Sequence, residues 1–101
     1  MSLKKQFLKS KPLCKVSFKV NQKDAKGAKS IQLLGDFNNW DADTAPMKSL
    51  KNGSFSQTVN LTSGKDYQFR YLLDGNIWSN EKEADASISN SFNSVNDIVS
   101  T

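Results

Sequence analysis

The sequence predicts a single all-β domain, an antiparallel β-sandwich of about seven short strands. Apolar and polar residues alternate with a period of two in several segments, and turn-forming residues separate these segments at short intervals. No segment shows the longer period that is typical of a helix. The 101 residues suffice for one hydrophobic core and leave no room for a second domain of ordinary size.

Two segments show the alternation most clearly. In residues 14–20, apolar side chains alternate with Lys15, Ser17 and Lys19, and in residues 67–73 three aromatic residues and a leucine share one face. Both patterns are typical of strands that place one face on the core. The other strands are expected at residues 31–34, 47–50, 55–61, 77–78 and 95–99.

Turns and loops join these strands. Asn52-Gly53 predicts a type I′ hairpin turn, because both residues tolerate the positive φ angle that this turn requires. Asp74-Gly75 predicts a second tight turn. Loops are expected in the polar segments 21–29, 36–46, 62–65 and 79–93.

Lysines concentrate near the N-terminus, where six of them, from Lys4 to Lys19, carry much of the formal net charge of +4. We expect residues 1–12 to form a basic arm and residues 13–101 to form the sandwich domain. Lysines on the outer face of a strand add solubility and discourage edge-to-edge association of sheets. The alternative is a basic patch that attracts nucleic acid or another polyanion.

The residue inventory excludes several kinds of chemistry. The chain has no histidine, and Cys14 is its one cysteine, so an internal disulfide, the usual zinc sites and catalysis with an imidazole base are excluded. We therefore expect no metal and no cofactor. No apolar run is long enough for a signal peptide or a membrane span, so a cytoplasmic location without membrane contact is expected.

Three segments carry a resemblance to a known family. They are LGDFNNW at residues 34–40, YQFRYLLDG at residues 67–75 with Trp78 close behind, and FNSVN at residues 92–96. Together they resemble the early-set module at the N-terminus of isoamylases, pullulanases and glycogen branching enzymes, which is carbohydrate-binding module family forty-eight. The glycogen-binding domain of the AMP-activated kinase β subunit is closely similar. The resemblance runs from about Val16 to Val99.

The resemblance implies an immunoglobulin-like (early-set) sandwich that binds α-1,4-linked glucan, such as glycogen, starch or maltooligosaccharides. It implies that two tryptophans, Trp40 and Trp78, hold the sugar together with a basic residue on the intervening strand, Arg70. The implied loop contacts are Phe92, Ser94 and Asn96.

These residue types suit a sugar ligand. The axial C–H groups make one face of a glucose ring apolar, so a flat indole can cover that face while polar side chains bind the hydroxyls. Covering roughly 50–80 Å² contributes about 1–2 kcal/mol, and dissociation constants from about micromolar to millimolar are expected. A tryptophan could instead fill the core, but the Asn and Asp residues around Trp40 favour exposure.

Three functional hypotheses follow. The favoured one is a free-standing, non-catalytic glucan-binding module that targets a separate enzyme of glycogen metabolism to the polysaccharide. A protein-interaction module that docks such an enzyme or a kinase without binding sugar is the second. Single-stranded nucleic-acid binding is the third, and it is weakened because the lysines lie far in sequence from the tryptophans. Enzymatic cleavage is not expected, because most carboxylates fall at turn positions.

Overall fold

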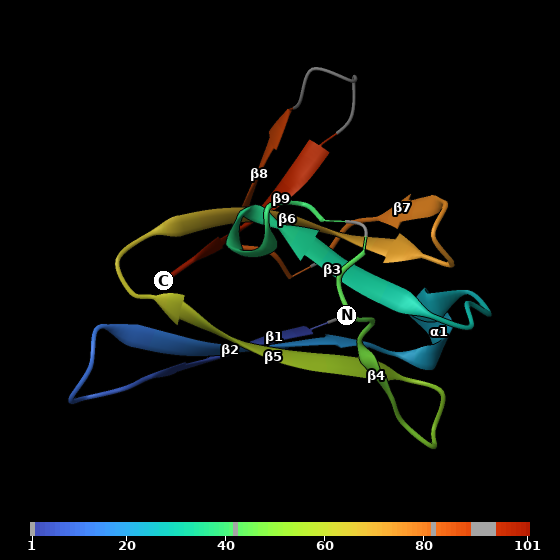
Figure 1. The fold of residues 1–101 in the computed structure, drawn as a ribbon, viewed down its shortest axis with the longest axis horizontal. Coiled ribbons are helices and arrows are strands. Elements are labelled where there is room, and N and C mark those ends of the chain that lie inside the picture. Colours follow the sequence, from blue (N-terminus) through green and yellow to red (C-terminus); the bar gives the residue numbers. More distant parts are fainter. Residues whose placement is uncertain (1, 42, 82, 90–94) are drawn as a thin grey trace.

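The computed structural model describes residues 2–41, 43–81, 83–89 and 95–101. These residues form two antiparallel sheets that pack face to face (Figure 1). Sheet A has the order β1-β2-β5-β4, with β1 at Ser2–Phe7, β2 at Leu13–Val20, β5 at Phe55–Thr62 and β4 at Lys48–Ser49. Sheet B has the order β3-β6-β9-β8, with β3 at Ile31–Gly35, β6 at Asp66–Leu73, β9 at Val95–Ser100 and β8 at Ala86–Ser89, and β7 at Ile77–Ser79 also pairs with β6. The predicted all-β sandwich is confirmed.

The core lies between the two sheets and comes from the alternating segments. Every second residue of β2 from Cys14 to Val20 is fully buried, and so are Phe69 and Tyr71 of β6. Aromatic rings pack edge to face across the layers, with 5.1 Å between the ring centroids of Phe18 and Phe69. Successive side chains of a strand point to opposite faces, so the period-two pattern in the sequence arises because one face of each sheet is buried.

The described residues contain nine strands rather than about seven. The first additional strand is β1, which pairs with β2 along its whole length, so residues 2–7 lie in sheet A. The boundary predicted at residue 13 stays a prediction. The second is β8, which lies within the segment 79–93 that was expected to be a loop, so that expectation is wrong for residues 86–89. All four β8 residues are exposed, and the strand therefore leaves no hydrophobic pattern in the sequence.

The hairpin at Asn52-Gly53 forms, because β4 pairs with β5, but the predicted type I′ turn is wrong. Of the two residues only Gly53 has a positive φ, at 84°. The Gly53 N–H donates to Leu50 O, and Asn52 Oδ1 accepts the Ser54 N–H, so a side chain supports the turn. The expected loop 21–29 also contains a short helix, α1 at Gln22–Ala25. No helix among the described residues is long and apolar enough to cross a membrane.

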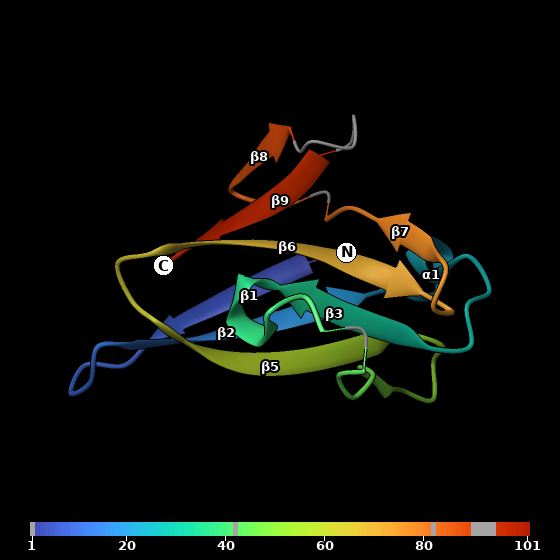
Figure 2. The ribbon, with the colours of Figure 1, turned by 45° about the horizontal axis from the view of Figure 1, so that its top comes forward.

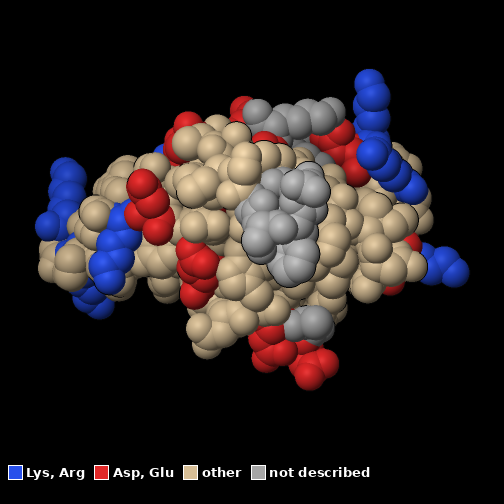
Figure 3. Space-filling view, turned by 90° about the horizontal axis from the view of Figure 1, so that it is seen from above, with Lys and Arg blue, Asp and Glu red and all other residues tan. Residues whose placement is uncertain are grey.

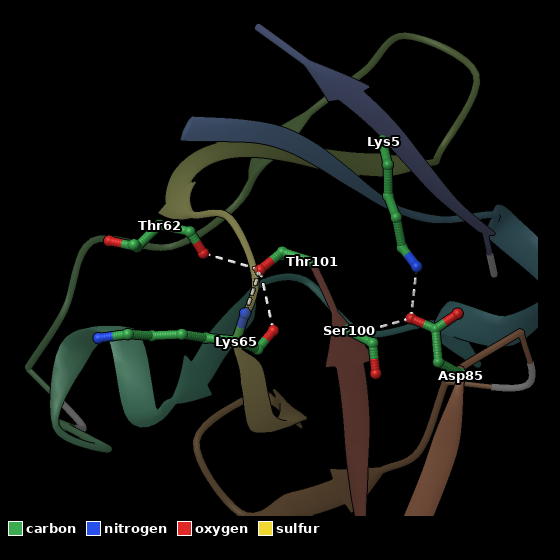
Figure 4. Close-up of polar contacts among 6 residues, drawn as sticks. All are labelled: Lys5, Thr62, Lys65, Asp85, Ser100 and Thr101. Atoms are coloured by element: carbon green, nitrogen blue, oxygen red, sulfur yellow. Dashed lines mark hydrogen bonds and ion pairs between the residues drawn. The ribbon is translucent and has the colours of Figure 1, made fainter. Parts of the chain in front are cut away.

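Polar contacts close the sandwich at its edges (Figure 4). Lys5 Nζ of β1 lies 2.6 Å from Asp85 Oδ2, which also accepts the Ser100 N–H of β9, so this contact joins sheet A to sheet B. At the β5–β6 corner, Tyr67 Oη accepts the backbone N–H of Thr62 at 3.1 Å. Such a tyrosine at the start of a strand is typical of immunoglobulin-like sandwiches.

Candidate carbohydrate-binding site

The two tryptophans meet on the outer face of sheet B. Trp78 lies on β7 opposite Leu72, and Trp40 follows the 3-10 helix η1 (Asp36–Asn38) at the end of β3. Their ring centroids are 6.5 Å apart and their planes are inclined at 61°. Trp78 is 44% exposed and Trp40 is partly exposed, and neither belongs to the core. The fold therefore brings two distant residues into one exposed aromatic pair.

Arg70 completes this aromatic pair. Its guanidinium carbon lies 4.7 Å from the centroid of the Trp78 ring. A guanidinium at this distance from an indole is held by a cation–π interaction, which is worth about 0.5–1 kcal/mol at exposed sites. The position of Arg70 near the tryptophans was expected, but its stacking on Trp78 was not, because stacking depends on which strands become neighbours. Arg70 therefore restrains Trp78 and places hydrogen-bond donors beside it.

Two leucines form an apolar base on the same face. Leu34 lies opposite Arg70 and Leu72 lies opposite Trp78 in the strand register. Both are almost completely buried, at 1% and 6% exposure, yet neither is part of the core cluster between the sheets. Side chains on the outer face therefore cover them. The sequence signal was visible in β6, where Leu72 falls among the outward-facing positions.

Asn96 lies on β9 and contacts the neighbouring strand β6. Its Nδ2 donates to Gln68 Oε1 at 3.0 Å, and Gln68 occupies an outward-facing position of β6. The sequence reasoning missed Gln68, which has no distinctive local pattern. The other two predicted loop contacts, Phe92 and Ser94, lie outside the described residues. The assignments of all six residues as sugar contacts stay predictions.

The loop that carries Trp40 is built by its own sequence. Asn38 Oδ1 accepts the Gly35 N–H, and Asn38 Nδ2 donates to Leu33 O, so one amide ties the loop to β3. Phe37 packs against the core, with its ring centroid 6.0 Å from that of Phe18. An inward Phe37 and an outward Trp40 match the expectation for this segment.

Asp36 also belongs to the site, although the sequence reasoning did not select it. Its Oδ1 accepts the indole N–H of Trp40 at 3.0 Å, and its Oδ2 accepts the backbone N–H of Gln68 at 2.8 Å. The signal that could have found it is the spacing of four residues between an Asp and a Trp across a tight loop. This contact links the Trp40 loop to strand β6.

A second polar cluster lies on the inner side of sheet B, away from the tryptophans. Tyr71 Oη donates to Glu81 Oε1 at 2.8 Å, and the Glu81 N–H donates to Asp97 Oδ2 at 2.6 Å. Glu81 and Asp97 are both nearly completely buried. Burial raises the pKa of Glu81 and the pKa of Asp97 above their ordinary values.

This cluster makes the stability of the protein depend on pH. Because each folded-state pKa exceeds the unfolded one, the folded protein binds more protons, and the free energy of unfolding falls as pH rises from about 4 towards 7. Glu81→Gln removes one of these titrations and keeps one acceptor oxygen for the neighbouring donors. We expect its melting temperature to fall less steeply between these pH values than that of the parent.

Thermal unfolding followed by circular dichroism over this pH range checks the expectation. The measurement stays above about pH 4 because Asp85 has the opposite effect below that value. Burial alone would raise the pKa of Asp85, but the hydrogen bonds from Lys5 and Ser100 lower it overall. Parallel melting profiles of the variant and the parent would show that Glu81 does not cause the pH dependence.

Three lysines of sheet A lie on the side of the molecule opposite to the tryptophans, whereas Lys5 faces sheet B and binds Asp85. Lys15 and Lys19 alternate with buried residues of β2, and Lys4 pairs with Ser17, so all three face outwards from sheet A. Figure 3 looks onto the sheet B side, where basic residues gather towards the two ends and uncharged residues occupy much of the face between them. The described residues therefore do not form a basic groove with interleaved aromatics, the arrangement required by the nucleic-acid alternative.

The fold and the site together define a class of protein: a β-sandwich with an exposed aromatic pair and neighbouring hydrogen-bonding side chains is the architecture of a carbohydrate-binding module. A family model described as the glycogen recognition site of AMP-activated protein kinase matches residues 18–101. Because the match covers most of the chain, the chain belongs to this family, and the resemblance predicted from the sequence is confirmed. None of the curated proteins compared matches the sequence.

Proposed function

We propose that this chain binds α-1,4-linked glucan of the glycogen type, with Trp40, Trp78 and Arg70 as the main contacts and Asn96 at their side. One observation carries the proposal: in a member of a glycogen-recognition family, the two indoles meet on one exposed face, 6.5 Å apart. Targeting of a separate enzyme of glycogen metabolism to the polysaccharide is the biological role that we propose for this binding.

The inclination of the rings supports a curved ligand. The α-1,4 linkage turns each glucose relative to the next, so such a chain coils, whereas a β-1,4-linked chain is a flat ribbon. A flat ribbon would need coplanar rings, but the planes of Trp40 and Trp78 are inclined at 61°. The proposal therefore includes selectivity for α-linked over β-linked chains.

We also propose that the chain does not cleave its ligand. Glycoside hydrolysis usually needs two carboxyl groups on opposite sides of the scissile bond. Asp36, the carboxylate beside the aromatic pair, is engaged by Trp40 and by the backbone of Gln68. The carboxyls with raised pKa values, Glu81 and Asp97, are buried on the inner side of sheet B. These placements support a binding role.

Titration of the tryptophan fluorescence with maltoheptaose tests the proposal. We expect a saturable change with a dissociation constant from about micromolar to millimolar, because two ring contacts are offset by the ordering cost of binding. Cellohexaose at the same concentrations serves as the control and is expected to give no saturable change. The protein is also expected to be retarded in a native gel that contains glycogen.

The same measurements separate the docking alternative. A protein-interaction module that keeps the fold without binding sugar would show neither fluorescence saturation nor gel retardation. That pair of negative results would overturn the proposed function.

A further inference from the structure

We propose that Asp36 is a positioning residue of this site, whose carboxylate sets the orientation of the Trp40 indole before the glucan arrives. The inference rests on the proposed function, because it gives Asp36 a part in the same site. It goes beyond the aromatic and basic contacts, since Asp36 acts on the sugar through another side chain.

The two oxygens of Asp36 join two separate parts of the site. Oδ1 accepts the Trp40 indole N–H at 3.0 Å, and Oδ2 accepts the Gln68 N–H at 2.8 Å. Strand β3 ends at Gly35, which pairs with Phe69. The Asp36 side chain therefore accepts the N–H of Gln68, the β6 residue just beyond this last pair. Hydrogen bonds to an ionised carboxylate are stronger than bonds between neutral groups. The ring of a loop residue is thereby fixed to the strand that carries Arg70.

The backbone of Trp40 shows why such a restraint is needed. Its φ angle is 55°, in the left-handed region that bulky residues rarely adopt. A conformation of this kind persists only where surrounding contacts impose it. The Trp40 N–H donates to Gly35 O at 3.0 Å, which restrains the backbone but not the ring. On the ring, the hydrogen bond from the indole N–H to Asp36 adds to the contact with Trp78.

The indole has one polar group, its N–H, and this group donates its hydrogen bond to Asp36. Trp40 therefore offers a sugar its apolar face rather than a hydrogen bond. The carboxylate also holds the ring at its inclination to Trp78, so this arrangement of the two rings is formed in the free protein. A preformed contact surface binds more tightly because ordering of its side chains is not required during binding.

The first experiment compares Asp36→Ala with the parent by isothermal titration with maltoheptaose. We expect roughly a three- to ten-fold loss of affinity from the ordering of one freed tryptophan side chain. Asp36→Asn keeps one acceptor oxygen, and its affinity is expected to lie between those of Asp36→Ala and the parent. Asp85→Ala is the matched control, because Asp85 also accepts a backbone N–H but lies at the sandwich edge. Its affinity is expected to equal that of the parent.

A double-mutant cycle separates positioning from general support of the fold. Trp40→Phe keeps an aromatic face and removes the indole N–H. If Asp36 acts through that N–H, Asp36→Ala in the Trp40→Phe background changes the affinity by less than about two-fold, because the coupled group is already gone. An equal loss in both backgrounds would overturn the inference.

A measurement without sugar tests the restraint on Trp40 separately from the proposed function. In ¹H–¹⁵N spectra, Asp36→Ala is expected to shift the indole N–H signal of Trp40 and to accelerate its hydrogen exchange, with little change for Trp78. If the parent binds no glucan, the proposed function fails while these spectra still test the restraint. If the parent binds glucan and a folded Asp36→Ala binds it equally well, the positioning role fails while the proposed function stands.

Discussion

Replacement of Trp78 by alanine is expected to weaken maltoheptaose binding roughly five- to thirty-fold. The reason is the loss of about 1–2 kcal/mol from the sugar face that the indole covers. Trp78→Ala also leaves the Arg70 guanidinium without the ring on which it stacks, so the donors of Arg70 lose their restraint. Trp40→Ala is expected to have a similar effect, because each ring supplies one of the two aromatic contacts. Isothermal titration measures both changes.

Controls for these variants lie in the same chain. Ile77 is 56% exposed and directly precedes Trp78, but it pairs with Leu73 and lies on the opposite face of the strand. Phe7 is an exposed aromatic residue on the edge strand of sheet A. Ile77→Ala and Phe7→Ala remove exposed apolar surface of comparable kind and are expected to bind maltoheptaose as the parent does. Trp78→Ala with a native spectrum and an unchanged affinity would refute the site assignment.

Replacement of Gly35 by alanine is expected to cause the largest loss of stability among the substitutions proposed for this protein. An added Cβ would lie 2.6 Å from Gln68 O, 2.8 Å from Phe37 Cε2 and 2.9 Å from Phe69 Cβ. The nearest atom is the backbone of the neighbouring strand, which cannot retreat without disturbing the pairing of β3 with β6. We expect a loss of roughly 1–3 kcal/mol, which is typical of overpacking. Each kcal/mol lowers the melting temperature by roughly 4–8 °C in a domain of this size.

The same substitution is expected to weaken sugar binding. Gly35 O accepts the Trp40 N–H and Gly35 N–H donates to Asn38, so a shift of Gly35 moves the loop that carries the ring. Gly64→Ala is the matched control, because Gly64 has a positive φ of 79° but no atom within 4 Å of the added Cβ. A smaller loss of stability with unchanged binding is expected there. Equal melting temperatures for Gly35→Ala and the parent would contradict the close-approach explanation.

Some elements of the fold could be predicted because their signal is local. The strands around Phe18 and Phe69 bury one face each, and burial of one face imposes a period of two on the sequence. The edge strands β1 and β8 could not be predicted in this way. Their residues are largely exposed, so apolar side chains were not required at alternate positions. Figures 1 and 2 show β8 at the outer edge of sheet B, beyond β9.

The sequence by itself determined the sandwich class, the family and the identity of the exposed tryptophans, because alternation and motif are properties of consecutive residues. Only the tertiary structure decided how these residues act together. The stacking of Arg70 on Trp78 joins two strands, and the bond from Gln68 to Asp36 joins a strand to the 3-10 helix η1. Such contacts depend on strand register and on the conformation of one loop, and a one-residue change of register would move every side chain of a strand to the other face. The geometry of the site therefore follows from how the strands pair.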